Sequence, residues 1–186
     1  VLACILKAVD THADLLRESA ADVGNDHRLG ANEAPPAIIS DFLGEQLEDV
    51  MTQLTESRSA TTSKKGGTLK TGVMSLNDIG KDATDRNRTS PFAFTGNKFE
   101  FRMVGSRDSI AAPNTVLNAI VAEAFCEASD ELEKAEDFDS AVHDLIKKYM
   151  TEHQRIVFNG NGYSEEWVEE AARRGLPNIT SMVDAI

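Results

Sequence analysis

The 186-residue chain carries 31 acidic and 19 basic side chains, which give it a formal net charge of −12 at pH 7. Such an acidic chain, with no basic stripe, is repelled by nucleic acid, and no apolar segment approaches the roughly 20 residues that a membrane span needs. We therefore expect neither nucleic acid nor a membrane as a partner. The length is sufficient for a real core and predicts one domain or one and a half.

The two cysteines, Cys4 and Cys126, both fall within apolar helical patterns. We expect them to be buried free thiols, as is typical of a protein from the reducing cytoplasm. The sequence does not open with a signal-peptide pattern, which also favours a cytoplasmic location. The four histidines lack the spacing of zinc ligands.

Apolar residues at helical spacing dominate the first third of the sequence. They predict a helix over residues 2–22 and a second over 37–57, separated by a loop at 25–36 that contains a Pro-Pro pair. Residues 58–84 begin with a small, polar and basic stretch and predict a flexible insert. A strand is expected at 98–104, directly after a basic loop.

Three further helices are predicted in the second half, over residues 113–128, 138–155 and 165–174. Ser164 is expected to cap the start of the last helix, and Gly175 is expected to end it. The expected fold class is therefore α+β, mostly helical with a small antiparallel sheet.

The predicted strand separates its side chains onto two unlike faces, because alternate residues of a strand point in opposite directions. Phe99, Phe101 and Met103 share one face, and Lys98, Glu100 and Arg102 share the other. An ordinary surface strand with solvated charges is the plain alternative. The preceding loop, in which Arg86 and Arg88 flank Asn87, favours an anion site instead.

Three short motifs and the tail of the chain occur in a distinctive order. They are HRLGANEAP at 27–35, NRTS at 87–90, EFR at 100–102 and HQRIVFNGNGYSEEW at 153–167. Together they resemble the glutamine synthetase family, and more narrowly its type III form, with its Arg-Leu and Glu-Ala-Pro loop, its Asn-Arg-Ser phosphate loop and its Glu-x-Arg strand. The resemblance implies that residues 1–128 are the C-terminal portion of the catalytic domain and that 129–186 are a type III helical extension.

The resemblance also implies a reaction. The family phosphorylates the side-chain carboxylate of glutamate with ATP, and ammonia then attacks the γ-glutamyl phosphate to form glutamine. Phosphoryl transfer depends on positioning and on neutralising charge, which requires divalent cations and arginines. The implied cofactors are therefore ATP and Mg²⁺ or Mn²⁺, and the implied substrates are glutamate and ammonia.

Four residues of the second and third motifs receive nucleotide or metal roles from the resemblance. Glu100 would be a ligand of the metal shared with the nucleotide, since hard cations prefer oxygen ligands. Arg102, on the same face, would contact the transferring phosphate or the substrate carboxylate. Arg88 would contact the ATP phosphates, and Lys98 would be a further nucleotide contact.

Two residues of the first motif receive substrate roles. Arg28 would pair with a carboxylate of glutamate, for which its fork of donors is suited. Glu33 would lie on the family's mobile flap, help to form the ammonium site and close the intermediate off from water. The alternatives are that Arg28 caps the preceding helix and that Glu33 is a surface acid.

The chain also departs from the better-known bacterial type of the family. Roughly fifty residues separate Pro36 from Asn87, and Ala93 stands where that type has a second arginine, which weakens the assignment of nucleotide contacts. Two other functions stay open: a related ligase that joins glutamate to another amine, and a non-catalytic helical assembly module. The resemblance further implies a ring-based homo-oligomer, with an active site shared between subunits, and predicts that this chain alone is inactive.

Overall fold

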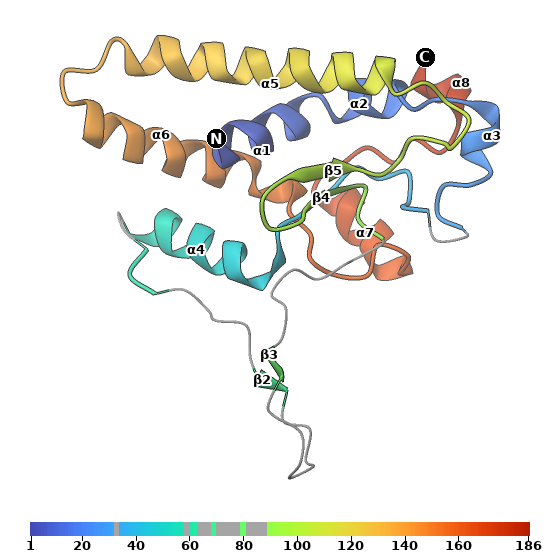
Figure 1. Ribbon diagram of the computed structural model, residues 1–186, viewed down its shortest axis with the longest axis horizontal. Helices are drawn as coiled ribbons and strands as arrows, with labels where there is room; N and C mark the ends of the chain where they lie inside the picture. Colours follow the sequence, from blue (N-terminus) through green and yellow to red (C-terminus); the bar gives the residue numbers. More distant parts are fainter. Residues whose placement is uncertain (32–33, 58–59, 63–67, 70–78, 81–88) are drawn as a thin grey trace.

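Helices make up most of the computed structural model, which describes residues 1–31, 34–57, 60–62, 68–69, 79–80 and 89–186 (Figure 1). The helical elements are α1 (Leu2–Thr11), α2 (Ala13–Glu18), α3 (Val23–Asp26), α4 (Gly44–Glu56), α5 (Ala111–Leu132), α6 (Phe138–His153), the 3-10 helix η1 (Gln154–Ile156), α7 (Glu165–Arg173) and α8 (Met182–Ala185). The strands are β1 (Asp41–Phe42), β2 (Thr68–Leu69), β3 (Ile79–Gly80), β4 (Phe92–Phe94) and β5 (Phe99–Phe101).

The predicted helix over 2–22 is interrupted at His12. The backbone of His12 leaves the helical region, with φ −119° and ψ 33°, so that α1 and α2 are separate elements. The apolar stripe still faces the core, because Leu6, Val9 and Leu16 are all fully buried. The imidazole of His12 lies 2.9 Å from the carboxylate of Glu123 on α5, so the break coincides with a tertiary contact.

The predicted helix over 37–57 is wrong for its first seven residues. Residues 37–43 are not helical: Ile38 forms a bridge with Asn178, Asp41–Phe42 form β1, and α4 begins only at Gly44. A short apolar run does not distinguish a helix from a buried strand, and here the run is buried on both sides. The side chain of Asn159, far along the chain, accepts hydrogen bonds from the backbone N–H groups of Leu43 and Gly44 at 2.9 and 2.8 Å.

The main sheet has three strands in the order β1-β4-β5. The β4–β5 pair is antiparallel, whereas β1 and β4 are parallel. The α+β class with a small sheet is thus confirmed, but the sheet is mixed because β1 joins it through a crossover. The separate β2–β3 pair is antiparallel.

The helices of the second half follow the sequence closely. Helix α5 is longer than predicted at both ends, and α6 and η1 together cover the predicted 138–155 to within a residue. Ser164 caps α7 by accepting a hydrogen bond from the N–H of Trp167 at 3.2 Å, and Gly175 follows the helix with φ +72°. Cys4 is buried as expected, but Cys126 is exposed on the outer side of α5, so that prediction is wrong.

Helix α1 packs against both α5 and α6, which are themselves in contact (Figure 1). An ion pair between Lys7 and Glu127 joins α1 to α5, and Lys148 of α6 lies 2.8 Å from Glu131 of α5.

In the part of the chain that the structure describes, no helix is both long and apolar enough to cross a membrane.

Candidate functional site

The strand β5 presents the two faces that its sequence predicts. Its apolar side stacks on β4, with the Phe92 and Phe99 rings 5.1 Å apart and the Phe92 and Phe101 rings 6.5 Å apart. On the charged side, Nη2 of Arg102 lies 3.0 Å from Oε2 of Glu100. Nζ of Lys98 lies 3.4 Å from the other carboxylate oxygen. The sheet therefore places one carboxylate between two cations.

The surroundings of Glu100 keep its carboxylate ionised. The hydrogen bond from Arg102 is the largest effect and lowers the pKa of Glu100 below its usual range; burial partly opposes it, and Lys98 adds to it. The Glu100 side chain is 38% exposed. An ionised and accessible carboxylate is a suitable oxygen ligand for a hard divalent cation.

Arg28 is fixed to the end of the same strand. Its Nη1 donates to the Asn25 side-chain oxygen at 2.9 Å and to the Met103 carbonyl at 3.0 Å, and its Nη2 donates to the Arg102 carbonyl at 3.4 Å. These bonds occupy the edge of the guanidinium formed by the two terminal nitrogens. Its Nε–H and second Nη2–H have no acceptor among the residues described, so the other edge has the geometry for one carboxylate.

Asn25 organises this corner, although the sequence indicated only the end of a helix there. It is 3% exposed, and its amide group donates to the carbonyls of Ala20 and Met103 at 2.8 and 2.9 Å. Its oxygen accepts from Arg28. The feature of the sequence that indicates a helix start near Asn25 is Asp22. Its carboxylate caps the short helix α3 by accepting a hydrogen bond from the backbone N–H of Gly24 at 2.8 Å.

The structure thus brings together four of the six predicted site residues: Arg28, Lys98, Glu100 and Arg102. Glu33 and Arg88 lie outside the described residues, as does most of the predicted insert at 58–84. Among the residues that are described, no group of three His, Cys, Asp or Glu side chains could hold a metal ion by itself. Glu100 is therefore at most one ligand of such a site.

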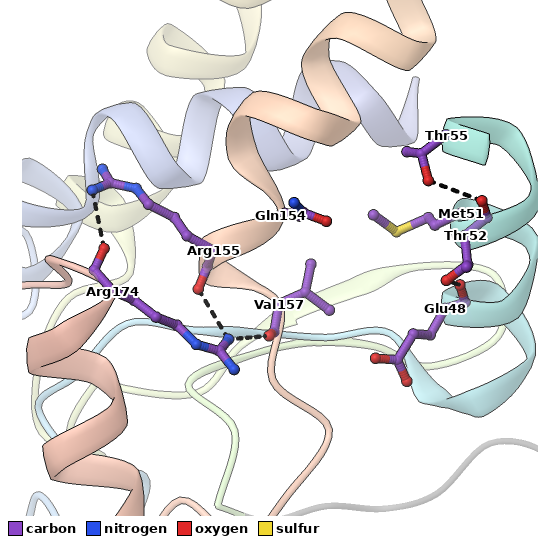
Figure 2. Close-up of a pocket in the computed structure, with 8 residues that line it drawn as sticks. All are labelled: Glu48, Met51, Thr52, Thr55, Gln154, Arg155, Val157 and Arg174. Carbon is purple, nitrogen blue, oxygen red and sulfur yellow. Dashed lines mark hydrogen bonds between the residues drawn. The ribbon is translucent and has the colours of Figure 1, made fainter.

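A cavity of about 400 Å³ lies elsewhere, between α4 and the segment from η1 to α7 (Figure 2). Glu48, Met51, Thr52 and Thr55 line it from α4, and Gln154, Arg155, Val157 and Arg174 line it from the opposite side. Figure 2 shows that the Arg174 guanidinium bonds to the carbonyls of Arg155 and Val157, at 3.2 and 2.9 Å. None of these residues is one of the six predicted site residues.

Comparison with known proteins gives the family. A family model described as the glutamine synthetase C-terminal domain matches residues 141–186. The whole chain is 48% identical over 188 residues to a type-3 glutamine synthetase of Dictyostelium discoideum. It is 45% identical over 190 residues to a glutamine synthetase of Bacteroides fragilis (strain YCH46) and 42% identical over 194 residues to one of Butyrivibrio fibrisolvens. The chain belongs to the glutamine synthetase family.

The alignments cover 98–100% of this chain but only 25–26% of each relative. The chain therefore spans about a quarter of the length of the curated glutamine synthetases that it matches. Helix α5 passes through residues 128 and 129 without a break, and the matched C-terminal domain begins at 141. The division of the chain into 1–128 and 129–186 stays a prediction.

Proposed function

We propose that this chain supplies one wall of the active site of a glutamine synthetase, which joins ammonia to glutamate with ATP through a γ-glutamyl phosphate. The observation that carries this proposal is the charged face of β5, where Glu100 is held ionised between Lys98 and Arg102, with Arg28 fixed to the end of the same strand. The chemistry needs a carboxylate for a cation and arginines for phosphate and substrate oxygens.

Each residue of this wall has one task in the proposal. Glu100 holds Mg²⁺ or Mn²⁺ as one of several ligands, and the cation, when bound, neutralises charge on the ATP phosphates. Arg102 holds the transferring phosphate or the substrate carboxylate. The unused edge of Arg28 binds a carboxylate of glutamate in a bidentate manner.

The remaining roles rest on the sequence resemblance. Glu33 is proposed to help form the ammonium site and to keep water from the intermediate, and Arg88 and Lys98 are proposed to contact the nucleotide. The position of Lys98 supports its proposed contact with the nucleotide, because its side chain is 66% exposed and lies beside Glu100. We also propose a ring-based homo-oligomer, and a reducing cytoplasm as the site of action, because both cysteines are free thiols.

The proposal predicts that the complete synthetase polypeptide is active and that the isolated 186-residue chain is not, because a single carboxylate cannot hold the cation. The test is phosphate release that depends on both glutamate and ammonia. Release by the isolated chain would contradict the proposal. A panel of amines on the complete polypeptide separates ammonia from other acceptors, and rejection of ammonia would favour the related amine ligase.

A further inference from the structure

The C-terminal segment of the chain returns to the corner that carries Arg28. After α7 the chain runs back across the molecule, and α8 lies next to α2 and α3 (Figure 1). Two polar contacts accompany this packing. Nε of Arg17 donates to the Ile179 carbonyl at 2.8 Å, and the backbone N–H of Met182 donates to Oδ2 of Asp26 at 2.6 Å.

Arg17 and Asp26 form an ion pair that connects these two contacts. Nη2 of Arg17 donates to Oδ1 of Asp26 at 2.8 Å, and the Arg17 side chain is 1% exposed. Both carboxylate oxygens of Asp26 are therefore used, one by α2 and the other by the start of α8. The pair fastens the C-terminal segment to the last residue of α3.

Arg28 follows Asp26 by two residues, within a turn held by the same helix end. The N–H groups of Arg28 and Leu29 both donate to the Asn25 carbonyl at 2.9 Å. The Asn25 side chain in turn accepts from the Arg28 guanidinium. A shift of Asp26 therefore moves both the backbone and the side-chain support of Arg28.

The Arg17–Asp26 pair is poorly suited to be a simple stabilising contact. The Nη1 group of Arg17 is buried and has no hydrogen-bond partner among the residues that the structure describes, which costs free energy. Only the Arg17 side of the pair is fully buried, since the Asp26 side chain is 19% exposed, and even fully buried ion pairs contribute little net stability. Its distinctive property is geometric, since it fixes two chain segments more than 150 residues apart, Asp26 and Met182, in one register.

We propose that the C-terminal segment, through Ile179 and Met182, positions Arg28 to bind the substrate carboxylate, with Arg17 and Asp26 as positioning residues. This inference rests on the proposed function, in which Arg28 binds glutamate. It gives the C-terminal domain a role in substrate affinity in addition to its part in the fold. Neither Arg17 nor Asp26 touches the substrate.

The substitution Met182→Pro in the complete synthetase polypeptide tests the contact selectively. It removes the backbone N–H from which Asp26 accepts a hydrogen bond. Proline is favoured at this position, because Met182 is the first residue of helix α8. Ser181, with φ −120° and ψ 150°, already has the extended backbone that precedes a proline. Met182→Ala is the matched control, because it removes the side chain and keeps the N–H.

We expect Met182→Pro to raise KM for glutamate about tenfold, since small misplacements of a binding group are costly. KM for ATP should not change, and Met182→Ala should resemble the wild type. Hydrogen exchange at the amides of Arg28 and Leu29 should become faster in Met182→Pro only. An unchanged exchange rate, or an unchanged KM for glutamate, would overturn the inference.

Arg28→Ala separates this inference from the proposed function. If Arg28→Ala raises KM for glutamate and Met182→Pro does not, the positioning role is wrong and the substrate role of Arg28 stands. If Arg28→Ala leaves KM for glutamate unchanged, the proposed role of Arg28 is itself wrong. Should Met182→Pro not assemble, Asp26→Asn gives the same readouts, and an unchanged KM for glutamate in that variant overturns the inference.

Discussion

Arg102 donates from both Nε and Nη2 to one oxygen of Glu100, at 3.3 and 3.0 Å. Glu100 lies on β5 and Arg102 directly follows its last residue, so the contact follows from the two-residue period of an extended chain. The second oxygen of Glu100 faces Lys98 and the Thr95 hydroxyl, at 3.4 and 3.5 Å. The carboxylate is thus held in place by groups that keep it negative, which is the state a cation requires.

Glu100→Gln should abolish this charge while keeping the shape of the side chain. In the complete polypeptide we expect kcat/KM to fall by about 10²-fold or more, because even residues that only support a metal ligand contribute 10- to 100-fold. The Mn²⁺ concentration needed for half-maximal activity should rise. Asn97→Ala is a suitable control, since Asn97 is exposed in the turn before the same strand. Unchanged metal dependence would contradict the assignment of Glu100.

The sequence predicts the existence of β5 and the later helices well because their local patterns are strong, although the strand covers only Phe99–Phe101 of the predicted 98–104. Alternation in Lys98–Arg102 assigns each side chain to its face, and the Ser164 cap marks the start of α7. In both cases the deciding interactions lie within a few residues of one another, so local physical chemistry suffices.

The sequence does not predict features that distant segments decide. Residues 37–43 are not helical, and Asn159 and Asn178, more than 100 residues away, bind that segment. The link from Arg28 to Met103 spans 75 residues, and Asn25, which carries no pattern of its own, also donates to the Met103 carbonyl. A short apolar run or a lone polar residue gives no information about such partners.

Asp41 should make the stability of the fold depend on pH. Its side chain is fully buried, and neither oxygen has a hydrogen-bond partner in the described part of the chain. Burial, and secondarily the charge of Asp10, raise the pKa of Asp41 well above its ordinary value. The unfolded chain releases this proton near pH 4, whereas the folded chain keeps it. Above that pH the unfolded state binds fewer protons, so the free energy of unfolding falls as pH rises, by at most about 1.4 kcal/mol per pH unit.

Asp41→Asn removes this ionisation and keeps the size of the side chain. The variant should gain stability relative to the wild type as the pH is raised from 5 to 8. Urea unfolding at several pH values measures the difference. Asp14→Asn, on an exposed side chain of α2, is the control and should show no such trend. If the difference in the free energy of unfolding between Asp41→Asn and the wild type does not change with pH, ionisation of Asp41 does not destabilise the folded chain, and the prediction is wrong.

Asp10 joins the first helix to the C-terminal part of the chain. Its two oxygens accept from His153 Nδ1 at 2.7 Å and from Arg155 Nε at 2.8 Å, and its side chain is 3% exposed. Asp10→Ala should lower the free energy of unfolding by about 2–3 kcal/mol, since both hydrogen bonds involve a charged acceptor.

The exposed pair of Lys148 and Glu131 provides the control for Asp10. Both side chains are 46% exposed, so Lys148→Met should change stability by no more than about 0.5 kcal/mol. Urea unfolding of both variants at pH 7 gives the comparison. Equal effects of the two substitutions would mean that burial adds nothing to the Asp10 contacts.

We expect Trp167 to contribute more than any other residue to the packing of α7 against the rest of the protein. Its ring is 1% exposed and stacks on Phe158 at 3.7 Å with an interplanar angle of 8°, while the Arg174 guanidinium lies 5.4 Å from the ring centroid.

Trp167→Ala leaves a large cavity beside the segment of Val157, which forms a bridge with Asp41. We therefore expect the free energy of unfolding to fall by about 3–5 kcal/mol. Trp167→Phe should cost less, because it keeps a stacked ring and removes the buried indole N–H, for which the described residues provide no hydrogen-bond partner. Val168→Ala, at a 43% exposed neighbour on the same helix, should have almost no effect. Urea unfolding followed by circular dichroism measures all three variants, and a loss below about 1 kcal/mol for Trp167→Ala would show that α7 is held by other contacts.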